Sequence, residues 1–292
     1  MHHSILTLLA AAVSARGVLA SPVAVDCTRD FLQAATETYL AVQTAGKPDS
    51  LLGALATTSN ITYTEDAVPR DPRSGVLSLP LAIVHNASLL DTTQCATFTE
   101  IIVTDPSHPR VIGTQMRFSE KRLVKMETLV TQAGDWAFNA TETLHYAEAE
   151  TLAGKWAPIE PVSARDSRAV IQAAADAYLD LFNNKSVVVP WGTPCDRLEG
   201  SWYTGNGSAT DSCDVGVPSG VVIKNRRYVI DETIGAVDAL VTFATRPDSH
   251  MFRVANGVIR QVHTLTVMRN VTGTTGRGVK RATKGRWAKK LW

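Results

Sequence analysis

The sequence lacks the short motifs that mark several large classes of enzyme. It contains no G-x-S-x-G elbow, no H-E-x-x-H zinc motif, no Walker A loop and no strand-linked G-x-G-x-x-G. None of its four cysteines stands in a C-x-x-C pair, and no histidine lies at metal-ligand spacing. The sequence therefore gives no support to a hydrolase, a metalloprotease or a nucleotide-dependent enzyme, and we expect neither a metal nor an organic cofactor.

Long apolar runs and a strong charge excess are also missing. The apolar run at 5–13 is too short to cross a bilayer, and no later segment comes closer. The net charge is +1, but the segment 273–292 is basic and carries no acid, so the remainder of the chain is acidic. This distribution argues against nucleic acid as the main partner. With 45% hydrophobic residues, the chain can bury an ordinary globular core.

The N-terminus has the features of a secretory signal. The apolar run is followed by Val18-Leu19-Ala20 before Ser21, a small-residue cleavage site. Six N-glycosylation sequons follow, which in one chain favour the secretory pathway of a eukaryote. We therefore expect a secreted or lumenal glycoprotein with a signal peptide over 1–20. The sequon asparagines are Asn60, Asn86, Asn139, Asn184, Asn206 and Asn270.

The four cysteines fit that oxidising compartment as disulfides. Four cysteines allow three pairings, and sequence alone leaves all three open. We favour Cys195–Cys213, which closes a Gly- and Ser-rich loop, and Cys27–Cys95, which ties the first helix to the first half of the chain.

The chain repeats itself. Segments 28–46 and 167–184 are amphipathic and similar, with Tyr39 matching Tyr178, and Thr28 and Ser167 are suited to cap the two helices. Each helix is followed by loops and strand-like runs. We predict strands at 97–104, 110–118, 122–131, 221–233, 236–245, 250–256 and 258–268, with turns at Asp105-Pro106, Arg246-Pro247-Asp248 and Asn256-Gly257.

A helix laid twice against a strongly curved antiparallel sheet predicts an α+β fold of two tandem NTF2-like cones, packed sheet against sheet. The alternative is one mixed α+β domain whose two helices agree by chance. The predicted organisation is a signal peptide at 1–20, a first half at 21–150, a linker at 151–166, a second half at 167–272 and a basic flexible tail at 273–292.

Two histidines stand on apolar strand faces in the second half. By alternation His250 shares a face with Phe252, and His263 shares one with Ile259 and Leu265. A histidine on each of two neighbouring strands predicts a lined cavity, in which either imidazole could hold or protonate a ligand oxygen near neutral pH. The alternative is a core histidine whose hydrogen bonds the protein itself satisfies.

The strand before them carries a dense polar run. Tyr228 could donate to a ligand oxygen, and Arg226 or Arg227 could hold an enolate. For the arginines we favour a network of pairs with Asp and Glu that ties strand to strand. We predict His250, His263 and Tyr228 as catalytic residues, and Trp191, Trp202, Arg253, Phe252 and Arg226 as substrate-binding residues.

Several blocks resemble a known family. GDWAFNATETLHY (134–146), VPWGTPCDRLEG (189–200), CDVGVPSG (213–220), NRRYVIDETIGAV (225–237) and PDSHMFRV (247–254) are similar to a fungal secreted family of uncharacterised, DUF8021-like domains with NTF2-like, SnoaL-like architecture. The resemblance implies cofactor-free chemistry on a hydrophobic small molecule. Some similar fungal proteins resemble the hetero-Diels–Alderases that join a tropolone quinone methide to a humulene-type terpene.

Three functions follow as hypotheses. The first is a cofactor-independent enzyme of fungal specialised metabolism, most concretely a hetero-Diels–Alderase or else a SnoaL-like cyclase or isomerase. The second is a secreted binding module for an apolar ligand, without turnover. The third is a structural secreted protein, which predicts no ligand-sized cavity. The expected partner is a hydrophobic small molecule, with no membrane span, and a homodimer is an assembly that the sequence allows.

Overall fold

The computed structural model describes residues 27–56 and 61–270. The predicted signal peptide, the Asn60 sequon and the basic segment therefore lie outside the described residues. Two disulfides, Cys27–Cys95 and Cys195–Cys213, join the cysteines in the pairing that the sequence favoured. The other five sequon asparagines are exposed.

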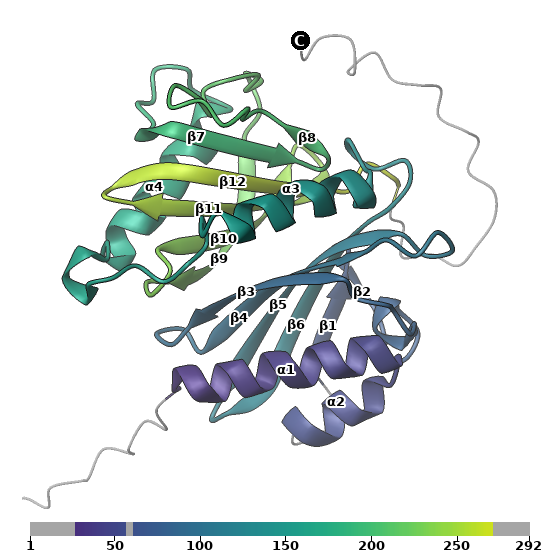
Figure 1. The fold of residues 1–292 in the computed structure, drawn as a ribbon. Coiled ribbons are helices and arrows are strands. Elements are labelled where there is room, and N and C mark those ends of the chain that lie inside the picture. The colour runs from purple at the N-terminus through teal and green to yellow at the C-terminus, as the bar shows by residue number, and fades with distance from the viewer. Residues whose placement is uncertain (1–26, 57–60, 271–292) are drawn as a thin grey trace, which may run out of the picture.

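The first half combines two helices with a mixed six-stranded sheet (Figure 1). Helix α1 spans Arg29–Ala45 and α2 spans Pro48–Leu55, and both cover one face of the sheet. The strands, in spatial order, are β2 (Val68–Pro69), β1 (Thr62–Glu65), β6 (Arg122–Thr131), β5 (Arg110–Ser119), β4 (Ala96–Val103) and β3 (His85–Asp91), with a short 3-10 turn at Val76–Ser78.

The second half repeats this order around helix α4, Arg168–Leu181. Helix α3, Ala140–Leu152, and a 3-10 turn at Val162–Ala164 connect the halves. The strands, in spatial order, are β8 (Trp202–Tyr203), β7 (Trp191–Glu199), β12 (Val258–Thr266), β11 (Arg246–Ala255), β10 (Ala236–Phe243) and β9 (Ile223–Asp231). In each half the sheet is antiparallel except where β1 pairs with β6, or β7 with β12, in parallel.

Helices α1 and α4 have the same kind of N-terminal cap and bury a tyrosine at the same position. The side chain of Thr28 accepts a hydrogen bond from the backbone N–H of Phe31, and that of Ser167 accepts one from the N–H of Val170, as the predicted caps require. Tyr39 and Tyr178 are fully buried against the two sheets. The α+β class and the two similar halves are therefore confirmed, and both sheets are open, with free edge strands rather than a closed barrel.

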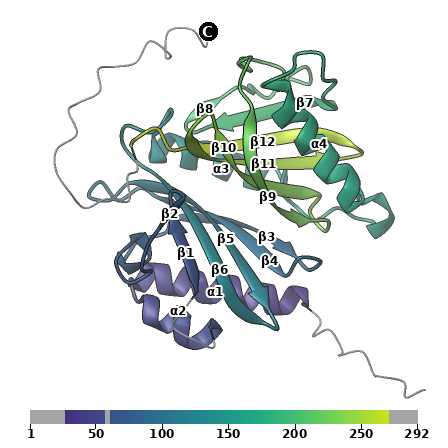
Figure 2. The same ribbon diagram turned by 180° about the vertical axis from the view of Figure 1, so that it is seen from behind.

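The two sheets face each other, and the helices α1 and α4 lie on their outer faces (Figures 1 and 2). Apolar residues from both halves fill the space between the sheets. One cluster joins Phe98 of β4 to Val229 and Met251 of the second sheet, and another joins Ile102 of β4 to Leu265 of β12.

A crossed pair of aspartate clamps joins the halves at their edge strands. Asp91, the last residue of β3, binds both terminal nitrogens of Arg168 at 2.8 Å and accepts from the backbone N–H of Ile230 at 2.9 Å. Asp231, the last residue of β9, binds Arg29 at 2.8 Å and accepts from the N–H of Leu90 at 2.9 Å. Each aspartate therefore holds the first residue of the other half's main helix.

The same turn follows both clamps. Asp91 and Asp231 each stand five residues before an alanine that opens the next strand, and the residue before that alanine has a positive φ, 48° at Cys95 and 57° at Gly235. Cys95 can hold this left-handed conformation because its disulfide and neighbouring strands fix it, whereas Gly235 adopts it without a Cβ penalty.

Some boundaries differ from the sequence expectation. Arg246–Asp248 is not a turn but the start of β11, and the turn lies just before it, where Ala244 has a φ of 54°. Sequence reasoning also missed α2, α3 and the strands β1, β3 and β7. Helix α3 ends inside the segment 151–166 that was expected as a linker.

We predict that Asp91→Asn lowers the free energy of unfolding by about 2 kcal/mol, because a hydrogen-bonded charge is removed from a buried position. Chemical denaturation of the purified protein measures this change. The matched control is Asp49→Asn, which removes the exposed pair with Arg73 and should cost well under about 1 kcal/mol. Equal effects of the two substitutions would contradict a structural role for the clamp.

Candidate functional site

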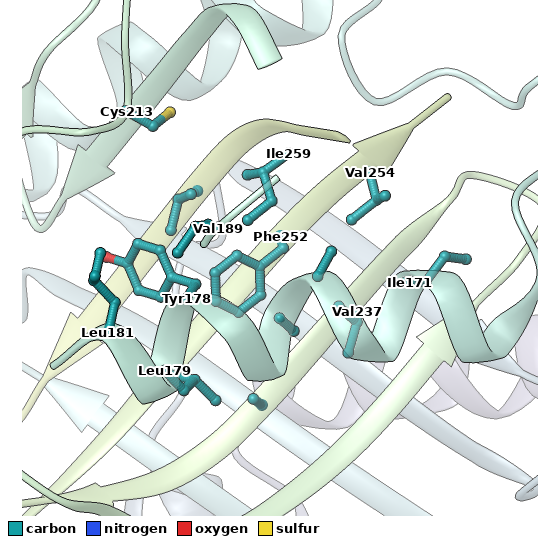
Figure 3. Packing of buried hydrophobic residues seen from close by; sticks show 14 of the residues in the cluster. Ile171, Tyr178, Leu179, Leu181, Val189, Cys213, Val237, Phe252, Val254 and Ile259 are labelled. Atoms are coloured by element: carbon teal, nitrogen blue, oxygen red, sulfur yellow. The ribbon is translucent and has the colours of Figure 1, made fainter. Parts of the chain in front are cut away.

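The candidate site lies between α4 and the outer face of the second sheet (Figure 3). Tyr178 points from α4 toward the strands and lies close to Phe252 of β11, with ring centroids 5.0 Å apart. The half-buried Trp191, at the start of β7, packs edge-on against Tyr178 at 5.6 Å. Phe182 also packs on Tyr178, at 5.4 Å. These aromatic rings pack on the ring of Tyr178 and form the apolar walls of the candidate site.

Buried polar atoms gather within these walls. His250 of β11 lies with its ring centroid 5.4 Å from that of Tyr178, and Thr264 of β12 is its direct partner across the strand pair. The Tyr178 hydroxyl, His250 Nδ1 and the Thr264 hydroxyl are all buried without a hydrogen-bond partner. Buried polar atoms are normally satisfied, and each one left unpaired costs about 1–3 kcal/mol.

The first half shows what these positions look like when they serve packing alone. There the strand register places Thr114 and Thr128 where the second half has His250 and Thr264, and Tyr39 occupies the place of Tyr178. Tyr39 bonds Thr114 at 2.9 Å, and Thr114 bonds Thr128 at 3.1 Å. The same three positions thus form a complete hydrogen-bond chain in one half and three unpaired groups in the other.

Charged groups border the site as well. Arg197 of β7 is buried with its guanidinium 5.7 Å from the Tyr178 ring, and its Nε has no partner. Its terminal nitrogens bind the carbonyl of Cys213, at 3.2 Å, and the carboxylate of Glu199. The Cys195–Cys213 disulfide holds this loop against β7. Burial raises the pKa of Tyr178, although Arg197 opposes the shift, so the hydroxyl remains a donor at neutral pH.

Asp248 is the second charged group at the site. It lies two residues before His250 on the same face of β11, with Oδ2 at 3.1 Å from His250 Nδ1. The two atoms are close enough to form an ion pair once the imidazole is protonated, but they are not aligned as a hydrogen bond. The other oxygen of Asp248 accepts a hydrogen bond from Thr266 at 2.7 Å. The site can therefore offer donors from Tyr178 and Arg197, and an imidazole backed by a carboxylate, to a ligand oxygen.

The structure separates the two histidines that the sequence placed together. His263 pairs with Met251 in the strand register, so it points to the opposite face of the sheet from His250. A register shift after Ile259 also moves that residue to the α4 side, away from Leu265. The expectation that His263 shares a face with Ile259 and lines one cavity with His250 is therefore wrong.

His263 instead sits in a buried ion-pair hub between the halves. It contacts Glu150 of α3 at 2.8 Å and Glu100 of β4 at 3.4 Å. Burial alone would lower its pKa, but the two carboxylates raise it to about 10, so the imidazole is charged at neutral pH. Trp156 and Tyr203 also donate to Glu150, at 2.6 and 3.0 Å. This geometry is that of a structural link.

The other predicted residues fall in different places. Tyr228 faces α4, but its hydroxyl donates to Asp176, and Arg226 pairs with Asp176 and Asp180 at 2.8 and 2.5 Å. Arg227 crosses to Glu127 of the first half at 2.9 Å. Arg227 thus makes a strand-to-strand ion pair of the kind favoured for the arginines, whereas Arg226 ties its strand to helix α4.

Two further predicted binding residues lie away from Tyr178. Arg253 points to the inner side of the sheet and donates to the carbonyl of Ala157 at 3.0 Å. Trp202 of β8 is partly exposed and packs edge-on against Trp136, with ring centroids 5.4 Å apart. Of the predicted set, the structure brings together His250, Phe252 and Trp191.

Tyr178, Thr264, Arg197 and Asp248 were not predicted as site residues. The available signal was the internal repeat. Aligning RVIGTQMRF (110–118) with RPDSHMFRV (246–254) places His250 opposite Thr114, an apolar-strand position where one half has a small hydroxyl and the other an imidazole. Only the strand register shows that Tyr178 and Thr264 then lose their partner.

The described residues form an α+β protein of two similar halves, with unpaired buried polar groups around Tyr178 in the second half. Residues 164–266, which contain all of the side chains described around Tyr178, match the model of a domain of unknown function (DUF8021). No curated protein matches the chain.

The disulfides fit an extracellular or lumenal protein. Among the helices that the structure describes, none is long and apolar enough to cross a membrane. Within the described ranges, no group of three or more His, Cys, Asp or Glu side chains is arranged to hold a metal ion. The seam between the sheets has a cleft of ≈ 20 Å³ beside Glu127 and Arg227, which has room for a water molecule.

Asp238 makes the seam sensitive to pH. Burial between the sheets raises its pKa to about 7, although hydrogen bonds from Ser249 and Gln115, each at 2.6 Å, oppose the shift. Because the folded pKa lies above the unfolded value of 3.8, this group stabilises the fold below about pH 4 and the contribution is lost as the pH rises toward 7.

We therefore predict that Asp238→Asn gains stability relative to the wild type between pH 4 and 7, at roughly 1 kcal/mol per pH unit. The amide oxygen can accept from Gln115 while the amide nitrogen donates to the Ser249 hydroxyl, so both contacts persist without a buried charge. Thermal and denaturant unfolding across this range measures the difference, with the exposed Asp49→Asn as control. A pH-independent difference between Asp238→Asn and the wild type would show that Asp238 does not titrate in this range.

Proposed function

We propose that the second half binds an apolar small molecule between α4 and its sheet, with a ligand oxygen at the Tyr178, His250 and Thr264 side chains. The observation that supports this proposal is the contrast between the halves. Where the first half completes its hydrogen bonds internally, the second leaves three buried groups for an outside partner. Apolar walls with a few convergent polar groups are the usual composition of a small-molecule site.

The activity that we propose is cofactor-independent chemistry on this ligand, within fungal specialised metabolism. Its most concrete form is a hetero-Diels–Alder addition on an NTF2-like scaffold, and both the reaction and the scaffold rest on the family resemblance. The heterodiene of a quinone methide and a terpene alkene would form one C–C and one C–O bond, with no atom lost and no oxidant consumed.

The residues fit such a reaction in two ways. The aromatic walls would hold two apolar partners face to face, which recovers much of the entropic barrier of a bimolecular step. A hydrogen bond from Tyr178 or Arg197 to the quinone-methide oxygen would stabilise the negative charge that develops there. Neither contribution requires a metal or an organic cofactor.

The internal repeat supplies the test. His250→Thr gives the second half the side chain that the first half has at this position. The hydrogen-bond chain from Tyr178 through the introduced hydroxyl to Thr264 should then close and raise the free energy of unfolding by about 1 kcal/mol. The same substitution should abolish binding of 2-naphthol, an apolar phenol, followed by fluorescence titration. It should also remove any excess of cycloadduct over the protein-free mixture of quinone-methide precursor and terpene alcohol.

The matched control is Thr114→Val in the first half. It breaks the chain to Tyr39 and should lower stability by about 1–2 kcal/mol while leaving 2-naphthol binding unchanged. Equal binding by the wild type and His250→Thr would overturn the site. Binding without any excess of product would leave a non-catalytic binding module as the function.

A further inference from the structure

We infer that Asp248 and His250 form a base that removes a proton from the bound molecule, so that the ligand is an acidic phenol or enol whose oxygen is held as an anion. This inference rests on the proposed function, because it assigns a ligand class to the same site: the ligand that loses the proton is a phenol or enol, since a quinone-methide oxygen has no proton to lose. It goes beyond orientation, since it requires a proton to move from the ligand to the protein.

The geometry of the pair supports this role. Both residues lie on one face of β11, two positions apart, and both are buried, with 1% of Asp248 and 3% of His250 exposed. His250 Nδ1 lies 3.1 Å from Asp248 Oδ2. The hydrogen bond from Thr266 fixes the carboxylate from the neighbouring strand. A carboxylate beside one ring nitrogen orients an imidazole and stabilises its protonated form.

The groups across from the pair suit an oxygen that becomes negative. From α4, the Tyr178 hydroxyl is a buried donor without a partner, and from β7 the buried Arg197 brings a positive charge and an unpaired Nε–H. Arg197 is itself paired with the carboxylate of Glu199. From β12 the same face presents the hydroxyls of Thr264 and Thr266, and no charged group.

One further carboxylate acts on His250 through the sheet. Asp238 lies on the opposite face of β10, where Ser249 and Gln115 hold it.

The first half provides an internal contrast. The positions of Asp248, His250 and Arg197 are there occupied by Ile112, Thr114 and Tyr63, none of which is a base or a permanent charge.

The step balances without a co-reactant. The ligand O–H bond breaks, its proton passes to Nε2 of His250, the ring nitrogen that does not face Asp248, and the electron pair remains on the ligand oxygen. The imidazolium is then stabilised by Asp248, and the oxyanion by the donors of Tyr178 and Arg197. Return of the proton after reaction, to carbon or to oxygen, regenerates the neutral base.

The test uses 4-nitrophenol, whose phenol and phenolate absorb at different wavelengths, with the full chain. We expect the bound probe to ionise at least one pH unit below the free probe, a tenfold shift in its equilibrium. His250→Gln should abolish the shift in the fraction of probe that it still binds, and Asp248→Asn should reduce the shift. The methyl ether 4-nitroanisole, which has no proton to lose, should bind the wild type, and its affinity for each variant measures how much binding that substitution costs.

The outcomes separate the inference from the proposed function. If the wild type binds 4-nitroanisole and 4-nitrophenol but leaves the phenol un-ionised, the proton-transfer role is overturned and the ligand site stands. A shift that persists in His250→Gln overturns His250 as the base. If the wild type binds neither probe, the proposed site and this inference both fail. The wild-type comparison does not depend on the folding of any variant.

Discussion

The crossed clamps of Asp91 and Asp231 are the contact on which the arrangement of this molecule depends. Each buried carboxylate satisfies a backbone N–H of the opposite edge strand and an arginine at the start of the opposite helix. Because both carboxylates are buried, loss of either arginine would leave a charge without compensation. The clamps therefore fix the two sheets and the two outer helices as one unit.

This constraint has a consequence for the site. Arg168 is the first residue of α4, and the carboxylate that holds it belongs to the first half. The helix that carries Tyr178 is thus positioned over its sheet from across the seam. The hub of His263, Glu100 and Glu150 adds a second link, which joins the two sheets to α3. The first half serves as the support for the second.

Duplication explains how such a division of roles could arise from one pattern. Both halves keep the helix tyrosine and the threonine of the last strand, and both keep the aspartate clamp. They differ at the position between the two hydroxyls, Thr114 in one half and His250 in the other. The exchange converts a closed hydrogen-bond chain into a set of unpaired groups, and the arrival of Arg197 and Asp248 adds charge to the same space.

Much of the fold could be predicted from the sequence because local pattern encodes it. Helix periodicity and capping residues located α1 and α4, and alternation located the long strands β4, β5, β6, β9, β10 and β12. Short or irregular elements such as β1 and β7 carry little periodicity. The strand β7 contains Pro194 within a Gly- and Thr-containing stretch, which is not a typical strand signal.

The site was predictable only in part. His250, Phe252 and Trp191 stood out by residue type. His263 was assigned to the wrong side of the sheet relative to His250 and Ile259, because the side depends on the strand register and on a shift after Ile259 that sequence alternation does not reveal. Tyr178 and Thr264 look like ordinary core residues, as do Tyr39 and Thr128 at the matching positions of the first half. Their importance follows from a missing hydrogen bond, which is a property of three-dimensional neighbours and not of any one position.

The most direct measurement is a crystal structure of the protein soaked with 4-bromophenol, in which anomalous scattering locates the bromine. The account predicts one bound molecule between α4 and β11, with its oxygen within hydrogen-bond distance of Tyr178, His250 or Thr264, and none between α1 and β5. A molecule bound equally in both halves, or bound only outside the second half, would contradict it.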